Sequence, residues 1–188
     1  MVAALLFGLV SALGPYTVSG NFPSDLYGPV DTRMAGAVCA DGPCIWGHAD
    51  SNILPIKFHP PAGYRVKILS LRGDLVGWIK SLPGDPPTPA ESAAGILGGF
   101  QTPSSSNSVH CDFCADGTPL YIQDSVTDTQ AKTRAAFNYT DVGMYLDDDN
   151  ILNAKIASWL NTTNKPIHIE LTYTIQFTYE KDNRPPAA

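Results

Sequence analysis

The amino-acid sequence predicts an all-β protein, an antiparallel β-sandwich of the jelly-roll kind with long loops rich in proline and serine and little helix. The strongest observation is the segment 167–179, in which apolar or aromatic residues alternate with polar ones without a break. Such alternation, with β-branched and aromatic side chains, is typical of a strand that buries one face. Sixteen glycines and 16 prolines among 188 residues fit many turns between short strands.

Further strands are expected along the chain. The Arg-Gly-Asp sequence at residues 72–74 is predicted to form a tight hairpin turn, because glycine readily adopts turn conformations. Residues 149–161 fit a helix and a strand almost equally well. We prefer a strand, because the Asn-Thr-Thr-Asn-Lys-Pro sequence after it is typical of a turn into the final strand. The other expected strands are residues 17–22, 53–59, 64–71, 75–82, 119–126 and 135–140.

The length of the chain suits one domain of ordinary size. Residues 82–95 contain four prolines and are expected to form a loop, because proline disrupts a central strand. Residues 101–110 are expected to form a second, polar loop. We expect three parts: an apolar N-terminal segment at residues 1–20, a single β-sandwich domain at residues 21–180, and a flexible tail at residues 181–188.

The apolar run at residues 2–13 is shorter than the roughly 20 residues that span a bilayer, so no membrane span is expected. Its length matches the apolar core of a signal peptide, although no Lys or Arg precedes it. If it is removed, the protein is secreted to the extracellular surface. If it is retained, its side chains are expected to insert into a neighbouring subunit. The side chains expected to make that assembly contact are Val2, Leu5, Leu6, Phe7, Leu9 and Val10.

All four cysteines lie in two stretches that share the sequence Cys-Ala-Asp-Gly. Their even number and the export-like start of the chain favour disulfide bonds, with the connectivity left open. The alternative is a zinc site made by the same four sulfurs, or by three of them and one nearby histidine. A redox role is disfavoured, because no helical pattern follows the second pair. These residues are Cys39, Cys44, Cys111 and Cys114, with His48 and His110 as the nearby histidines.

The net charge of −6 and the isoelectric point near 5.0 argue against nucleic-acid binding, which requires a basic face. No nucleophile elbow, phosphate-binding loop, zinc-protease motif or dinucleotide fingerprint is present, so we expect a protein that is not an enzyme and needs no cofactor. Asn138 and Asn161 each begin an Asn-x-Thr sequence, the acceptor pattern for N-glycosylation.

The stretches PPAGYRVKILSL (residues 60–71) and CDFCADGTPLYIQDS (residues 111–125) resemble parts of CUB-like extracellular sandwich modules. The resemblance covers about two dozen residues, and the chain lacks the cysteine spacing of that family. What the resemblance implies is an extracellular jelly roll, and it assigns no site residue.

Three functions remain open from the sequence. The preferred one is a non-catalytic structural subunit at the cell surface, which associates with itself or with another surface protein and forms filaments by strand exchange through the N-terminal segment. The second is a secreted carbohydrate-binding or adhesion module that takes a glycan, with Trp46, Trp78 and Trp159 as candidates for stacking against sugars. The third is a zinc-dependent enzyme, which needs an open metal position with a base nearby.

The disulfide prediction is tested by mass spectrometry of the intact chain. With all four cysteines paired, the unreduced protein is expected to weigh less than the reduced protein by four hydrogen atoms, because each bridge removes two. Stoichiometric zinc together with free thiols would contradict the prediction.

Overall fold

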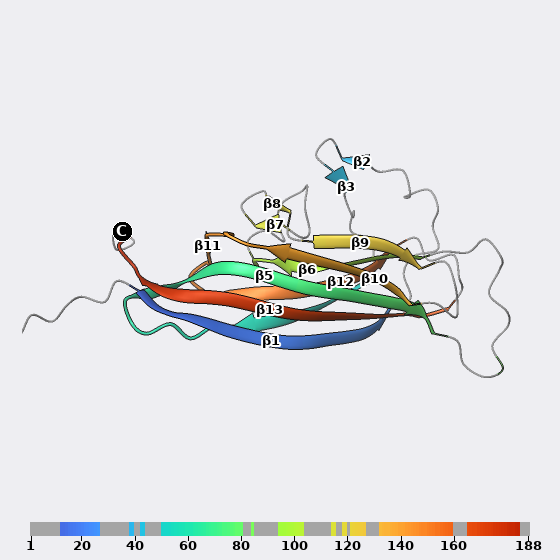
Figure 1. Ribbon diagram of the computed structural model, residues 1–188, viewed down its shortest axis with the longest axis horizontal. Coiled ribbons are helices and arrows are strands. Elements are labelled where there is room, and N and C mark those ends of the chain that lie inside the picture. The colour runs from blue at the N-terminus through green and yellow to red at the C-terminus, as the bar shows by residue number, and fades with distance from the viewer. Residues whose placement is uncertain are drawn as a thin grey trace, which may run out of the picture.

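The structure is a computed structural model. It describes residues 12–26, 38–39, 42–43, 50–80, 84, 94–103, 114–115, 118–119, 121–126, 132–159 and 165–184. The long strands form two antiparallel sheets that pack as layers (Figure 1). The first sheet contains, in spatial order, β1 (Ala12–Leu26), β13 (Ile167–Lys181), β5 (Tyr64–Ile79) and β10 (Thr133–Tyr139), with β11 (Met144–Tyr145) also paired to β5. The second contains β4 (Asp50–Lys57), β12 (Ile151–Trp159), β6 (Ala94–Gln101) and β9 (Tyr121–Val126).

The pairing pattern is that of a jelly roll. In chain order the eight long strands are β1, β4, β5, β6, β9, β10, β12 and β13. The first pairs with the eighth, the second with the seventh, the third with the sixth and the fourth with the fifth. This is the result of rolling one long antiparallel ribbon into two Greek keys. The predicted fold class is therefore confirmed, and the described residues contain no helix.

Strand β13 confirms the period-two prediction. Its inward side chains, from Ile167 through Ile175 to Phe177, are buried, and Tyr179 is half-buried. The strand pairs with β1 on one side and with β5 on the other along its whole length. A strand in this position buries its apolar face against the second sheet and leaves its polar face on the outside of the sandwich.

The predicted hairpin at Arg72, Gly73 and Asp74 is wrong. These residues lie in the middle of β5, which continues without a turn, and they pair with residues 172–174 of β13. Gly73 faces the core, where a Cβ atom would lie 2.5 Å from the ring carbons of Phe137. Glycine is therefore required at this position because an aromatic ring packs directly on the backbone. It does not form a turn.

Strand β5 contains a β-bulge. Ser70 pairs with Gln176, but the next pair joins Ile68 to Phe177, so Leu69 is an extra residue. Burial changes phase at the same point: Ile68 is buried, Leu69 and Ser70 are half-buried, and Leu71 is buried again. An extra residue of this kind bends a strand and changes the direction of its side chains.

The remaining segments also form strands. Residues 149–161 contain β12, as preferred over a helix, and its inward side chains Leu152 and Ile156 are fully buried. The central strands of the second sheet are buried on their outer face as well, since Leu97 of β6 and Ala157 of β12 have almost no exposed surface, whereas Ile53 of the edge strand β4 is 48% exposed. Strand β1 begins at Ala12, so residues 12–20 of the expected N-terminal segment pair with β13.

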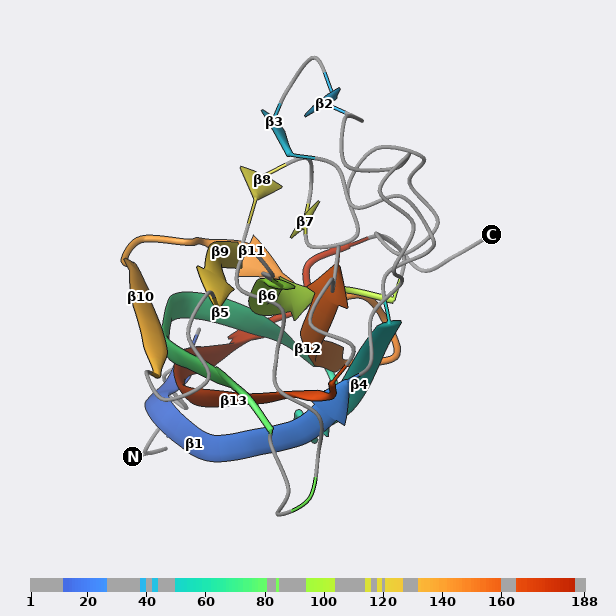
Figure 2. The ribbon, with the colours of Figure 1, turned by 90° about the vertical axis from the view of Figure 1, so that its right-hand side faces the viewer.

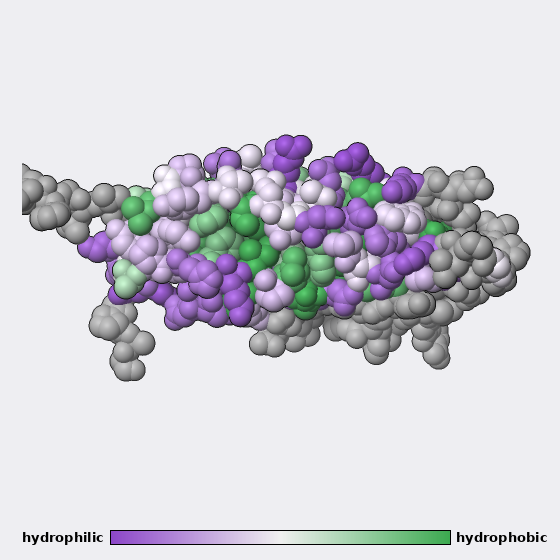
Figure 3. Space-filling model, turned by 90° about the horizontal axis from the view of Figure 1, so that it is seen from below, coloured by the Kyte–Doolittle hydropathy of each residue, from purple (hydrophilic) through white to green (hydrophobic). Residues whose placement is uncertain are grey.

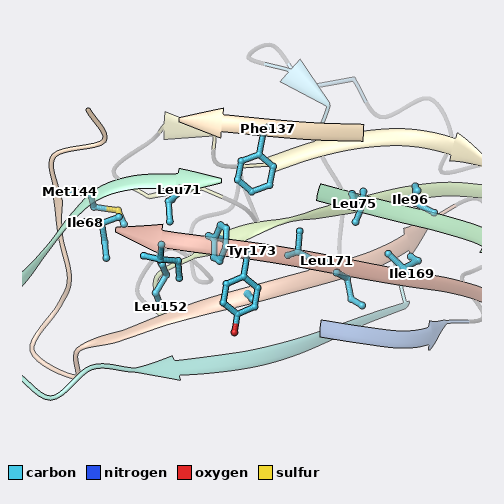
Figure 4. Packing of buried hydrophobic residues seen from close by; sticks show 14 of the residues in the cluster. Ile68, Leu71, Leu75, Ile96, Phe137, Met144, Leu152, Ile169, Leu171 and Tyr173 are labelled. Atoms are coloured by element: carbon cyan, nitrogen blue, oxygen red, sulfur yellow. The ribbon is translucent and has the colours of Figure 1, made fainter. Parts of the chain in front are cut away.

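The core lies between the two layers and is dominated by aliphatic and aromatic side chains of both sheets (Figure 4). Phe100 of β6 packs edge to face against Phe137 of β10 and Tyr173 of β13, with ring centroids 5.9 and 5.8 Å apart. Edge-to-face packing of this kind adds about 0.5–1.5 kcal/mol per pair to the gain from burial.

The two faces of β13 predict opposite mutational effects at adjacent residues. Ile175→Asp is expected to unfold the protein or make it insoluble, because it places an unpaired charge in the core. Thr174→Asp is expected to cost about 1 kcal/mol or less, because Thr174 lies on the outer face and only its hydrogen bond to Ser19, 3.0 Å long, is lost. Urea unfolding of both variants gives the comparison, and equal effects would contradict the facing of β13.

Candidate functional site

Strand β1 is a long open edge of the first sheet. Among the described strands it pairs with β13 alone, so one row of its backbone donors and acceptors has no strand partner. In its 15 residues Asp25 is the sole charged side chain. Natural edge strands usually carry lysines or other charges that prevent another chain from pairing with them. Here that protection is limited to Pro15, Pro23 and one carboxylate.

Strand β1 of the first sheet lies beside β4, the edge strand of the second sheet (Figure 2). Val18 and Phe22 of β1 and Leu54 and Ile56 of β4 pack against the core but remain partly exposed. We call these four residues the β1/β4 seam. Seen from this side, apolar residues emerge along the centre of the molecule between polar ones (Figure 3).

Two further features lie beside the seam. The side-chain amide of Asn52 in β4 donates a hydrogen bond to the hydroxyl of Ser24 in β1 and ties the two sheets together. Tyr16 lies near the start of β1 and is 42% exposed, although its ring lies 5.6 Å from that of Phe177 and 5.4 Å from that of Tyr179. The seam therefore continues to the N-terminal end of β1 as an apolar surface that water reaches.

A charged cluster lies at the other end of β1. The Lys80 ammonium donates to Asp25, and the Nδ1 atom of His168 lies 2.5 Å from the same carboxylate. The Nε2 atom of His168 lies 3.1 Å from Glu170. The hydrogen bond from Lys80, and after it the contact with His168, lower the pKa of Asp25 below its usual value of 3.8. The cluster joins β1, β5 and β13 through side chains.

A second cluster ties the short strand β11 to the end of β13. The Tyr145 hydroxyl donates to Glu180, and the Lys67 ammonium lies 3.1 Å from the same carboxylate. Both contacts, the Tyr145 hydrogen bond above all, lower the pKa of Glu180. The Arg65 guanidinium lies 4.0 Å from the centre of the Tyr145 ring, a cation–π arrangement.

The outer face of the first sheet is polar, and uncharged pairs lie on it between the charged clusters. Hydroxyl and amide side chains of neighbouring strands pair across it: Ser19 with Thr174 at 3.0 Å, Thr172 with Asn21 at 3.2 Å, and Ser70 with Gln176 at 3.0 Å. Cross-strand pairs of this kind stabilise a sheet by roughly 0.2–1 kcal/mol each.

An open groove of about 440 Å³ lies on this outer face, beside the bulge in β5. It is bounded by β5, β13, the end of β10 and the loop that follows β10. Of the side chains that line it, Leu69 alone is apolar, and the others carry hydroxyl, amide, guanidinium or carboxylate groups. The sequence pointed to Asn138 as a glycosylation candidate, but no sequence signal pointed to the groove itself, because it depends on a bulge and on residues of three strands.

The cysteine stretches fall partly within the described residues. Cys39 pairs through its backbone with Gly42, in the short hairpin of β2 (Val38–Cys39) and β3 (Gly42–Pro43). Cys114 pairs with Pro119, in the hairpin of β7 (Cys114–Ala115) and β8 (Thr118–Pro119). Cys39 and Cys114 therefore each lie on one strand of a short antiparallel pair. Cys44, Cys111, His48 and His110 lie outside the described residues, as do all the cysteine side chains, so disulfide and zinc binding remain predictions.

The other predicted site residues are placed as follows. Asn138 is exposed on β10 and lines the groove. Asn161 and the six assembly side chains from Val2 to Val10 lie outside the described residues. Of the three tryptophans, Trp78 alone has a described side chain, and its ring is occupied by His168 at 4.2 Å and by the Lys132 ammonium at 4.0 Å. It does not offer a free stacking surface.

No family model matches the chain, and no curated protein is similar to it. Several solved structures show a weak similarity in fold. VP1 of Merkel cell polyomavirus in complex with disialyllactose has 6% identity and a TM-score of 0.38, over 92% of this chain and 100% of that one. A structure of desmodium yellow mottle tymovirus has 10% identity and a TM-score of 0.32, over 93% and 87%.

An arabinose-bound α-L-arabinofuranosidase has 12% identity and a TM-score of 0.33, over 89% of this chain and 23% of that one. Likenesses at this level concern the course of the strands and do not bear on function. In the part of the chain that the structure describes, no helix is long and apolar enough to cross a membrane, and no group of three histidine, cysteine or acidic side chains is arranged to hold a metal.

The cluster around Asp25 predicts a pH dependence of stability. Because its pKa is lowered in the folded state, Asp25 stabilises the fold above its unfolded pKa, and this contribution is lost as the pH falls through the folded pKa. Asp25→Asn is therefore expected to lower the free energy of unfolding at neutral pH by about 1 kcal/mol or less. The difference from the parent chain should shrink as the pH is lowered from neutral to about 2, because the carboxylate is progressively protonated.

Urea unfolding at both pH values measures this effect. Asp74→Asn is the control, because Asp74 lies 3.9 Å from an Arg134 side chain that is 70% exposed and is expected to contribute less. A constant effect of Asp25→Asn at all pH values would contradict the assignment.

Proposed function

We propose that this chain is a non-catalytic structural subunit at an extracellular surface, and that its copies assemble head to tail. In this proposal the apolar N-terminal segment of one copy adds to the β1/β4 seam of the next. The observation that carries it is the seam: a long edge with one charge lies next to half-covered apolar side chains. Such an edge accepts an added strand through backbone hydrogen bonds, and the apolar pockets hold its side chains.

The donor segment suits the acceptor in length and chemistry. Residues 2–10 in extended form span about 30 Å, close to the length of the eight-residue strand β4. The segment carries no charge, which matches an edge where Asp25 is the sole charge. Burial of each Leu or Phe contributes about 1.5–3 kcal/mol, so the segment supplies enough apolar surface to join two subunits.

The donor precedes β1 directly, at the opposite end of the strand from Asp25. A contact in which the tail of one subunit binds the edge of another is heterologous. Contacts of this type give rings if the rotation closes and open filaments if it does not. We favour filaments for this subunit.

Sedimentation of the full-length chain over a range of concentrations tests the proposal. The parent chain is expected to form oligomers that grow with concentration. A triple variant, Leu5→Asp, Leu6→Asp and Phe7→Asp, is expected to remain monomeric, because each buried apolar contact becomes an unpaired charge. The matched control replaces the same residues with Met, Met and Leu, which keeps the segment apolar and should keep the assembly.

The acceptor is tested by neighbouring residues of β1. Val18→Lys places a charge in the seam and is expected to weaken assembly about tenfold or more, as an inward-pointing charge protects an edge. Thr17→Lys places the same charge on the outer face and should leave assembly unchanged. A parent chain that stays monomeric at high concentration would overturn the proposal. So would N-terminal sequencing that finds the segment removed from the exported protein, or protection of the segment within a monomer.

A further inference from the structure

The groove beside the bulge of β5 has a chemistry that the assembly edge does not use. It is bounded by β5, β13, the end of β10 and the loop at residues 140–143, and no residue of β1 lines it. Its volume of about 440 Å³ lies within the range of sites for small ligands.

The backbone shapes this groove before any ligand arrives. Leu69 is the extra residue in β5. The backbone N–H of Val142 in the loop donates a hydrogen bond to the carbonyl of Leu69 at 2.9 Å. Asp141 and Gly143 on either side of Val142 have left-handed φ angles of 58° and 63°. Bulges often serve to redirect side chains beside binding sites, and this one holds the loop against β5.

Part of the hydrogen-bonding capacity of the groove is unused within the described residues. Ser70 and Gln176 of the groove bond to each other, and Thr174 bonds to Ser19. Arg72, Asn138, Thr140 and Asp141 make no such side-chain hydrogen bond or ion pair with any described residue. They offer a donor-only guanidinium, an amide that donates and accepts, a hydroxyl that does both, and an acceptor-only carboxylate.

This set of groups selects for one class of ligand. A phosphate or nucleotide would meet one cation next to a carboxylate, and an apolar molecule would meet Leu69 alone. A metal ion would find one carboxylate where several oxygen ligands are usual. A sugar ring presents adjacent hydroxyls, each of which donates and accepts, above a face of C–H groups. Arg72, Asp141 and the Asn138 amide match the hydroxyls, and Leu69 matches the apolar face.

We propose that this groove binds one saccharide unit. Two sources supply such a unit. One is a free glycan of a partner molecule. The other is a glycan attached to the chain itself, because Asn138 and Thr140 belong both to the groove and to the Asn-Tyr-Thr glycosylation pattern. A sugar linked to the Asn138 amide would begin inside the groove.

The first arm of the experiment uses the full-length chain from a bacterial host that does not attach N-glycans. Saturation-transfer NMR is recorded with glucose, galactose, mannose, N-acetylglucosamine and glucuronate at millimolar concentration. If the groove binds a free glycan, at least one of these sugars is expected to bind. Arg72→Ala or Asp141→Ala is then expected to weaken binding about tenfold or more, since each removes a hydrogen bond to a charged group. Asp74→Ala, two residues from Arg72 on the same face and outside the groove, leaves binding unchanged.

The second arm uses the chain from a eukaryotic secretory host. If the groove binds a glycan attached to the chain itself, mass spectrometry is expected to find a glycan on Asn138. Arg72→Ala is then expected to lower the unfolding temperature of the glycosylated chain and to leave that of the Asn138→Gln chain unchanged. Binding of a free sugar that is insensitive to Arg72 and Asp141 overturns the proposal. The proposal is also overturned if no free sugar binds and Asn138 carries no glycan. It is overturned as well if no free sugar binds and the stability of the glycosylated chain does not depend on Arg72.

Discussion

The pairing of β13 with β5 is the constraint on which the rest of the structure depends. These two strands lie at the centre of the first sheet and pair along their whole length. Their inward side chains, among them Leu71, Leu75, Leu171 and Ile175, are completely buried against the second sheet. Because a shift of one residue would turn every apolar side chain of a strand outward, the burial of this face determines the register of β1 and β10 as well.

Register is kept although β5 contains an extra residue. The bulge at Leu69 changes the phase of β5 between Ile68 and Leu71, and β13 keeps its alternation on both sides of it. The same bulge gives the loop after β10 a carbonyl to bind and opens the groove beside Arg72. An irregularity that the core tolerates thus creates the most distinctive feature of the outer face.

The outer faces of the two sheets differ in how much of their surface water reaches. The central strands of the second sheet are buried on both faces, as Leu97 and Ile96 of β6 show. The first sheet exposes a polar face on which hydroxyl and amide groups pair with each other and charged groups form ion pairs. The edge at β1 has neither feature, because its inner face is only half covered. A subunit with such an edge gains from a partner that completes it, and this is the physical basis of the assembly proposed here.

The sequence alone determined the local features that depend on periodicity. The inward face of β13 was predictable residue by residue, because period-two alternation has one structural meaning. The strand at β12 and the jelly-roll class followed from the same patterns and from the frequency of turns. The tertiary structure decided what depends on contacts between distant residues. Gly73 looks like a turn residue until the ring of Phe137 is placed on it. The groove joins Arg72, Asp141 and Thr174, and the hydrogen bond beside the seam joins Ser24 to Asn52. No local pattern encodes such neighbours, because strand pairing brings them together across the whole length of the chain.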